Sequence, residues 1–198
     1  LPCIKGSARK ALEEDDSSEL GTGSVQLLMD TVDRYIKQPE RKKDTHFLMS
    51  IEGIFMATGR GTVLTGKIET GAVKIGDALE VVGGRDNVGT FCMGLEMFRK
   101  TLEAAEAGDN VGILVKAVKR DEVKRGYVLA ATNLIKAYNS FKAKIYALTY
   151  KEGGRHKPFV SNYTPQFFFR TANMTGSIIL PEEVSAVMPG DSLQVIVK

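Results

Sequence analysis

Apolar residues follow two different periods along this chain. Between residues 18 and 37 they recur every three or four positions, which predicts an amphipathic helix with the apolar stripe Val25, Leu28, Met29, Val32 and Ile36. Ser17 or Ser18 is a suitable N-cap residue, and Pro39 predicts that the helix ends before the charged linker 37–46. The stripe needs a cover, so we expect it to pack on the following domains or on another one.

From Phe47 onward, short β-rich runs separated by Gly, Asp and Asn turn signals replace the helical period. After a second boundary at 132–136, Phe141, Ala143, Ile145 and Ala147 alternate strictly with polar or charged neighbours. The spacing is typical of antiparallel barrels or sandwiches. The predicted strands are 47–56, 61–69, 78–83, 88–98, 111–118, 127–131, 166–172, 175–180 and 192–197. Because the chain ends on an alternating strand without a cap, we expect the second set of strands to be incomplete.

The segment Gly61–Lys67 has the spacing G-x-x-x-x-G-K of a phosphate-binding loop. Such a loop needs Ser or Thr after the lysine to hold Mg²⁺ and a helix to follow, but Ile68 comes next and the following residues have no helical period. Val63 and Thr65, between the glycines, are strand formers. We therefore predict a strand in which glycines permit a bend or the close approach of another backbone.

Composition narrows the classes further. The chain of 198 residues has a net charge of +3, and residues 134–198 hold 8 basic and 4 acidic side chains, which favours either an anionic partner or an ordinary solvated surface. Cys3 and Cys92 are far apart, which argues against a disulfide framework or zinc site and favours buried, inert thiols in a reducing compartment. No apolar run approaches the ~18 residues of a membrane span, and no secretion signal is visible in the sequence.

Several stretches together resemble the second and third domains of translational GTPases of the elongation factor Tu family. In chain order they include GRGTVLTGKIETG at 59–71, GLEMFRK at 94–100, EGGRHKPF at 152–159 and YTPQFFFRT at 163–171. The resemblance implies a mainly β chain: two antiparallel β-barrels preceded by the terminal helix of an α/β GTPase domain. The implied domains are the end of the GTPase domain with its linker (1–40), a β-barrel second domain (44–133) and an incomplete β-barrel third domain (134–198).

The function implied by the resemblance is that of a translation elongation factor. Such a protein binds GTP or GDP with Mg²⁺, carries aminoacyl-tRNA to the ribosomal A site and is released by GTP hydrolysis. The phosphate-binding and catalytic motifs of that GTPase are not in this sequence, so no cofactor is expected in this chain. The implied partners are aminoacyl-tRNA, the ribosome and the nucleotide exchange factor Ts, without a membrane. The stretches 19–36 and 153–161 look closest to mitochondrial versions, which suggests the mitochondrial matrix, with a bacterial cytoplasm or a plastid as alternatives.

The resemblance also implies roles for individual residues. Glu96 and Arg99 would contact the terminal adenosine of the tRNA, where a carboxylate can accept a hydrogen bond from a ribose hydroxyl. The remaining implied contacts are the amino-acid pocket at Phe55, Thr65 and Asn110, the tRNA 5′ phosphate at Arg125, the T stem at Arg155, His156 and Thr175, and guanine at Ser7 and Ala8.

Two residues depart from the family pattern, namely Arg9, where Leu or Lys is usual, and Gly53, where bacterial relatives tend to have Asp. Taken alone, Phe55 would be a core aromatic and Asn110 a turn residue. No residue is assigned a catalytic or metal-binding role in this chain. Two other functions stay open: a β-barrel protein-interaction module, or another translational GTPase such as a specialised tRNA carrier or initiation factor.

Overall fold

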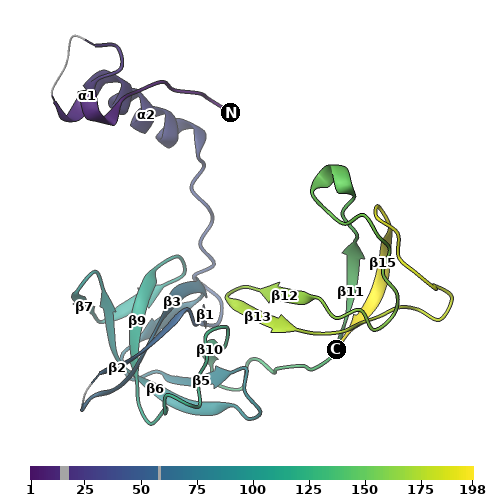
Figure 1. Cartoon of the computed structure of the whole chain (residues 1–198). Coiled ribbons are helices and arrows are strands. Elements are labelled where there is room, and N and C mark those ends of the chain that lie inside the picture. Colours follow the sequence, from purple (N-terminus) through teal and green to yellow (C-terminus); the bar gives the residue numbers. More distant parts are fainter. Residues whose placement is uncertain (14–17, 58) are drawn as a thin grey trace. The chain divides into compact units, whose positions relative to one another are not determined.

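The computed structural model describes residues 1–13, 18–57 and 59–198, and the chain divides into two compact units, Leu1–Glu40 and Arg41–Lys198 (Figure 1). The first unit contains two helices, α1 (Ala8–Leu12) and α2 (Thr22–Tyr35). No helix in the described part of the chain is long and apolar enough to cross a membrane.

Helix α2 begins later than predicted. Its N-cap is Gly21, without a side-chain hydrogen bond, so the predicted cap at Ser18 is wrong, and Ser17 lies outside the described residues. The Ser18 hydroxyl oxygen instead accepts hydrogen bonds from the Leu20 backbone N–H at 3.3 Å and from Lys10 Nζ at 3.1 Å. These local bonds hold the chain in a turn until Gly21.

The apolar stripe of α2 is present as predicted, but within its unit it stays exposed. Its five residues, Val25, Leu28, Met29, Val32 and Ile36, are 37–63 % exposed. Leu1, Pro2 and Ile4 line a shallow hollow beside this helix. The first unit therefore covers only part of the stripe.

The second unit begins with a closed antiparallel barrel. Its strands pair in the order β1-β10-β5-β6-β9-β3, and β1 also pairs with β3, which closes the ring. This confirms the predicted antiparallel barrel. The ring strands are β1 (Leu48–Ser50), β3 (Gly61–Thr70), β5 (Ala78–Val82), β6 (Val88–Met97), β9 (Asn110–Val115) and β10 (Val128–Ala131). Four more strands lie outside the ring: β2 (Gly53–Ala57) on β3, β7 (Lys100–Leu102) on β6, and the pair β4 (Ala72–Lys74) with β8 (Ala104–Glu106).

The predicted strand 47–56 is in fact two strands, because the chain leaves the sheet at Ile51 and Glu52. The Ile51 N–H donates to the Tyr127 carbonyl at 2.9 Å, and the Glu52 N–H donates to the Thr65 carbonyl at 2.8 Å. The break lets β1 and β2 pair with opposite ends of the long strand β3. The short strands β4, β7 and β8 were not predicted, since three residues cannot show a period.

The G-x-x-x-x-G-K segment lies wholly within β3, which confirms that it is a strand. A Cβ atom at Gly66 would lie 2.0 Å from the Ser50 carbonyl oxygen. At Gly61, where φ is 132°, a Cβ atom would lie 2.8 Å from the Val115 carbonyl oxygen. The two glycines therefore permit the close backbone approaches that close the barrel. Ile68, the residue that argued against Mg²⁺ binding, is fully buried in the barrel core.

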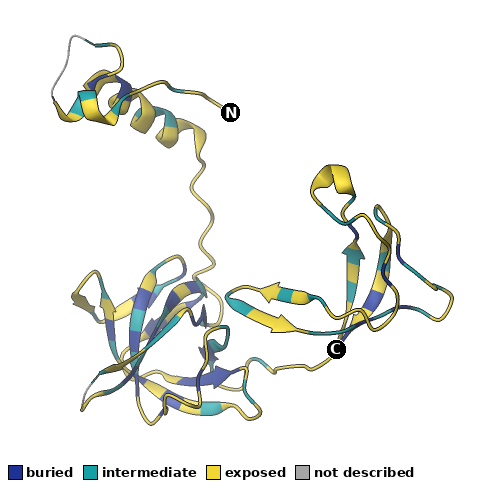
Figure 2. Ribbon diagram, viewed as in Figure 1, coloured by how far each residue is buried: buried dark blue, intermediate teal, exposed yellow. Residues whose placement is uncertain are grey.

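The rest of the second unit is an open set of strands with its own core (Figure 2). Strand β15 (Ser192–Val197) lies between β11 (Phe141–Tyr146) and β14 (Ile178–Ile179), and β12 (Gln166–Phe169) forms a hairpin with β13 (Ala172–Thr175). The predicted alternation is confirmed from Ala143 onward: Ala143 and Ile145 pack on the core, whereas Lys144 and Tyr146 are exposed. Phe141, predicted on the buried face, is 40 % exposed at the start of β11. The core contains Ala147, Phe159, Ile178, Leu180, Val187, Val195 and Val197.

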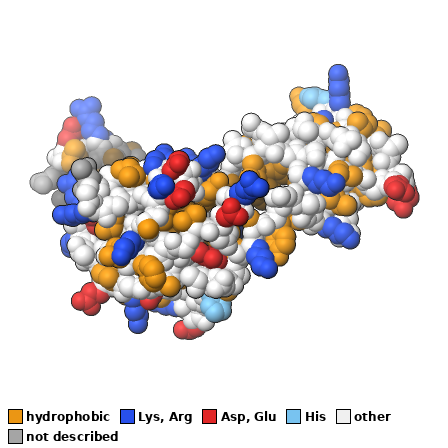
Figure 3. Space-filling view, turned by 90° about the horizontal axis from the view of Figure 1, so that it is seen from below, with side chains coloured by type: hydrophobic (Ala, Val, Ile, Leu, Met, Phe, Trp, Pro, Cys, Tyr) orange, Lys and Arg blue, Asp and Glu red, His pale blue; other side chains and the backbone are white. Residues whose placement is uncertain are grey.

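The tip of the β12–β13 hairpin contacts the closed barrel. Arg170 Nε donates to Glu69 Oε2 at 2.8 Å, and the Thr171 hydroxyl donates to the Ile51 carbonyl at 2.9 Å. Gly126 permits this approach, because a Cβ atom there would lie 2.6 Å from the Ala172 Cα atom. On the face seen in Figure 3, Lys and Arg side chains are dispersed rather than gathered in one patch.

Candidate functional site

One outer wall of the closed barrel gathers several of the predicted site residues. Across β2, β3, β9, β6 and β7, one register row contains Gly53, Thr65, Gly112, Glu96 and Thr101. Because successive residues of a strand point to opposite faces, Thr65 and Glu96 lie on the same face, separated by a residue without a side chain. Buried residues alternate with this row along β3 and β9, so the row faces outward.

The neighbouring row brings Phe55 to the same face. Phe55 pairs with Val63, Val63 with Leu114, and Leu114 with Gly94. Phe55 is 59 % exposed, so its interpretation as a core aromatic is wrong. Asn110 also faces outward, as the exposed first residue of β9 and the partner of Lys67. The structure thus brings Phe55, Thr65, Glu96 and Asn110 onto one wall.

A hollow of about 210 Å³ lies in this wall. Most of its lining consists of apolar side chains and of glycine backbone, and its charged residues are Arg60 and Glu96. An apolar surface with one carboxylate and one guanidinium suits a flat ring carrying hydroxyl groups. The lining residues are Ala57, Arg60, Val63, Gly94, Leu95, Glu96, Thr101, Gly112 and Leu114.

Sequence analysis had assigned only Glu96 among these lining residues. Arg60, Val63 and Leu114 were missed, although the alternation of β3 and the glycines at 94 and 112 were visible in the sequence. Phe55, Thr65 and Asn110 share the wall but do not line the hollow.

Arg99 lies at the tip of the β6–β7 hairpin and outside the lining of the hollow. Met97 pairs with Lys100, so Phe98 and Arg99 form the two-residue turn, with φ angles of 50° and 63°. Both values are left-handed, as a type I′ hairpin turn requires. Arg99 is thus an exposed cation three positions after Glu96 in the sequence, at the end of the hairpin that carries Glu96.

Gly53 shapes the region around Thr65 and Phe55. A Cβ atom at Gly53 would lie 2.6 Å from Thr65 Oγ1 and 3.0 Å from Phe55 Cε2. The missing side chain lets the hydroxyl group and the ring edge approach each other. At Gly53, where the resemblance implies Asp in bacterial relatives, the Thr65 hydroxyl and the Phe55 ring edge thus take the place of a side chain.

Thr62 has a structural role and does not reach this wall. It is 1 % exposed, and its hydroxyl donates to the Val118 carbonyl at 2.6 Å. The three polar residues between Gly59 and Gly66 thus have different roles. Arg60 lines the hollow, Thr62 stabilises the fold and Thr65 faces Gly53.

Arg125 lies in the loop before β10 and is exposed. It lines a polar hollow of about 470 Å³ together with residues of the β12–β13 hairpin, and Arg170 is the second cation of that lining. Two guanidinium groups suit an anionic ligand such as a phosphate. The other lining residues are Phe168, Thr171, Ala172 and Asn173.

Arg155 and His156 follow the short helix η1 (Tyr150–Glu152). The Arg155 Cζ atom lies 4.5 Å from the ring centroid of Tyr163 and 5.0 Å from that of Phe159. The exposed His156 ring lies against Tyr150 at a tilt of 34°, with 4.0 Å between the ring centroids. Neither aromatic contact was predicted from the sequence.

The loop is stiffened at its start by Glu152. The backbone N–H and the hydroxyl of Thr149 donate to Glu152 Oε2 at 2.9 and 2.6 Å, and these bonds lower the pKa of the Glu152 carboxyl group. The Tyr146 hydroxyl also donates to Glu152, which raises the pKa of that phenol. Thr175, the third residue assigned to the T stem, is exposed at the end of β13, opposite Gln166.

Ser7 and Ala8 lie in the first unit, at the start of α1. The Ser7 hydroxyl caps α1 by accepting from the Lys10 N–H at 3.4 Å, and the Ser7 N–H donates to the Leu20 carbonyl. Ala8 is exposed as the first helical residue, whose N–H has no intrahelical acceptor. Arg9 pairs with Glu13 at 2.8 Å on the solvent side.

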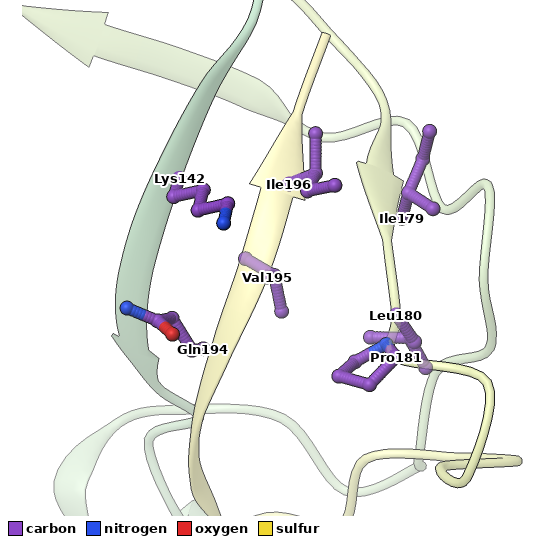
Figure 4. A pocket seen from close by; sticks show the side chains of 7 residues that line it. All are labelled: Lys142, Ile179, Leu180, Pro181, Gln194, Val195 and Ile196. Carbon is purple, nitrogen blue, oxygen red and sulfur yellow. The ribbon is translucent and has the colours of Figure 1, made fainter.

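A second apolar hollow, of about 230 Å³, lies on the sheet of β11, β15 and β14 (Figure 4). Its polar side chains are Lys142 and Gln194, and it contains no predicted site residue.

Cys92 is buried, as predicted, and burial raises the pKa of its thiol. Cys3 is exposed, so the same prediction is wrong there. Within residues 1–13, 18–57 and 59–198, no three His, Cys, Asp or Glu side chains are grouped as a metal site.

Two protein-family models match the chain. The model described as elongation factor Tu domain 2 matches residues 61–130, which cover the closed barrel except β1 and its outer wall except β2. The model described as the elongation factor Tu C-terminal domain matches residues 134–198, over the open set of strands. By these two consecutive matches, the chain belongs to the elongation factor Tu family of translational GTPases.

Proposed function

We propose that the intact protein is a translation elongation factor that binds GTP, carries aminoacyl-tRNA to the ribosomal A site and is released by GTP hydrolysis. The observation that carries this proposal is the hollow at Glu96 and Arg60, which shares its wall with Phe55 and Thr65. In aminoacyl-tRNA, an ester bond joins the amino acid to the terminal ribose. A protein that binds both groups therefore needs two adjoining pockets on one surface.

In this proposal the hollow takes the terminal adenosine. Val63 and Leu114 offer an apolar surface for the base, and Glu96 accepts a hydrogen bond from a ribose hydroxyl, the group that distinguishes RNA from DNA. Arg60 and the exposed cation of Arg99 balance the charge of Glu96 and approach the neighbouring phosphate.

The amino acid then lies over Phe55, Thr65 and Asn110. All three lie on an open outer wall, and Phe55 and Asn110 are largely exposed, so the pocket accepts side chains of different size. Because Gly53 contributes no carboxylate, the pocket has no negative charge at that position to favour cationic amino acids.

The body of the tRNA is assigned to the basic and hydroxyl residues Arg125, Arg155, His156 and Thr175. They suit contacts with the RNA backbone, which position a ligand without selecting its sequence. A carrier of many tRNAs needs that tolerance. Residues 134–198 contain 8 basic and 4 acidic side chains, so their net charge is opposite to that of the RNA backbone.

GTP with Mg²⁺ supplies the hydrolysable phosphoryl bond of the cycle. The free N–H of Ala8 at the start of α1 fits a contact with the guanine base, whereas the Ser7 N–H already binds Leu20. The ribosome, the exchange factor Ts and a mitochondrial matrix location complete the proposal. Cell fractionation tests that location, and recovery outside mitochondria would contradict it.

The test compares the binding of aminoacylated and uncharged forms of one elongator tRNA to the full-length protein with GTP. We expect a clear preference for the charged form. Glu96→Gln should weaken that binding about tenfold, since a charged acceptor is lost. Glu103→Gln changes an exposed glutamate outside the hollow and serves as the matched control. Equal binding of charged and uncharged tRNA would refute the carrier function and favour a protein-interaction barrel.

A further inference from the structure

The two adjacent residues Arg155 and His156 each rest on an aromatic ring from elsewhere in the same loop region. Arg155 lies over Tyr163 and Phe159, and the His156 ring lies tilted against Tyr150. Exposed arginines ordinarily sample many rotamers, and holding one costs side-chain entropy at the moment of binding. Here that ordering takes place in the free protein.

Of the two rings beneath Arg155, Phe159 belongs to the core, whereas Tyr163 is 37 % exposed and is held through its backbone. Phe159 is 7 % exposed and exchanges two backbone hydrogen bonds with Val187, at 3.1 and 2.9 Å. Tyr163 pairs with Ile178, whose N–H donates to the Tyr163 carbonyl at 2.9 Å. The two ring centroids are 5.1 Å apart. Arg155 therefore rests on one ring of the core and on a second ring whose backbone is paired with the core residue Ile178.

The contacts of Arg155 leave a particular part of its guanidinium group free. Its Nε–H donates to the Lys157 carbonyl at 2.8 Å, and the guanidinium group lies over the rings of Tyr163 and Phe159. The remaining donors are the N–H groups of the two Nη atoms. Such a pair of parallel donors matches two oxygens of one phosphate group.

We propose that Tyr163, supported by Phe159, is a positioning residue for RNA binding: it holds the Arg155 guanidinium so that the Nη atoms meet one phosphate of an RNA duplex. This inference rests on the proposed function, because it takes tRNA as the RNA. It assigns Tyr163 an indirect role that its position in the core-anchored segment would not suggest.

The experiment measures the salt dependence of aminoacyl-tRNA binding to the full-length protein with GTP. Affinity falls as salt rises, so the slope of log affinity against log salt concentration is negative. Arg155→Ala should make this slope less steep by about one, the effect of losing one phosphate contact. Tyr163→Leu removes the ring, so it should also make the slope less steep and should weaken binding about fivefold. Tyr163→Phe keeps the ring and should restore the wild-type slope.

Three controls separate positioning from general damage. Tyr138→Leu makes the same change at a tyrosine that is 76 % exposed and outside this loop, and it should leave binding unchanged. Tyr163→Met is used if Tyr163→Leu unfolds, as judged by thermal unfolding. In the double variant Tyr163→Leu/Arg155→Ala, binding should be no weaker than in Arg155→Ala alone, because the two residues act through one contact.

Two results overturn the inference while leaving the carrier function intact. One is an unchanged salt slope in Tyr163→Leu or Tyr163→Met. The other is full additivity of the Tyr163 and Arg155 effects on log affinity. Absence of any binding by the wild-type protein refutes the carrier function itself and the inference with it.

Discussion

Gly53 and Thr65 face each other across β2 and β3 so closely that a methyl group at residue 53 would lie 2.6 Å from the Thr65 hydroxyl oxygen. The Phe55 ring edge would lie 3.0 Å from the same methyl group. These three residues therefore form one steric unit. The absence of a side chain at Gly53 sets how near the other two approach.

We predict that Gly53→Ala changes the preference of the protein among amino acids more than its affinity for tRNA. The added methyl group must displace the Thr65 hydroxyl or the Phe55 ring, and one methyl group in such a pocket alters discrimination by about tenfold. The measurement is the affinity for one tRNA body charged with a small, an aromatic or an acidic amino acid. A uniform loss for all three would contradict the prediction.

Gly66→Ala should destabilise the closed barrel by about 3 kcal/mol, as overpacking against a fixed backbone does. The new Cβ atom would lie 2.0 Å from the Ser50 carbonyl oxygen, so β1 and β3 have to separate. Gly89→Ala in β6 is the matched control, since nothing lies within 4 Å of its Cβ position. Urea unfolding of both variants measures the difference, and equal midpoints would disprove the role of Gly66.

Thr62→Val should cost about 1–2 kcal/mol of stability although it preserves shape, because the buried Val118 carbonyl loses its donor. Binding of aminoacyl-tRNA by the folded fraction should stay unchanged, since Thr62 faces inward. Denaturant unfolding and a binding titration test the two statements separately. Weakened binding with normal stability would place Thr62 in the ligand wall instead.

The Glu152 carboxylate should make stability depend on pH in the acid range. Hydrogen bonds from Thr149 lower its pKa in the folded state, so the stabilisation is present above the unfolded pKa and is lost as the pH falls through the folded value. We expect the melting temperature of Glu152→Gln to lie below that of the wild type at neutral pH and to converge with it in acid. A parallel offset at every pH would contradict this.

A control and a second readout accompany that experiment. Glu182→Gln removes an exposed carboxylate elsewhere and should not reproduce the convergence. The Tyr146 phenol, whose pKa is raised by its hydrogen bond to Glu152, should titrate at lower pH in Glu152→Gln. Absorbance of the tyrosinate form follows that change.

The long strands were predictable because periodicity extends over many residues, as in β3 and β6. The start of α2 was not predictable, because the Ser18 hydroxyl accepts a hydrogen bond from Leu20 within a turn and Gly21 becomes the N-cap residue. A single sequence also gives no lateral register. Leu114 and Val63 become neighbours only through the pairing of β3 with β9, so the composition of the hollow had to come from the structure.

Aromatic support of Arg155 was unpredictable for a related reason. Tyr163 lies eight positions away in the sequence, in a segment without regular secondary structure, and no propensity indicates which side of the loop it faces. The family resemblance indicated Arg155 itself but not what holds it. Contacts made by irregular backbone depend on the whole fold.

Strand β3 divides two tasks between its two faces. From residue 62 to 68 the even positions are buried and close the barrel, whereas the odd positions face outward or lie half-exposed and include Val63 and Thr65. Under the proposed function, heritable variation in this strand is therefore divided: we expect substitutions at even positions to change how much of the protein is folded, and those at odd positions to change which ligands it prefers. Selection for new ligand preferences can therefore act on every second residue without passing through unstable intermediates.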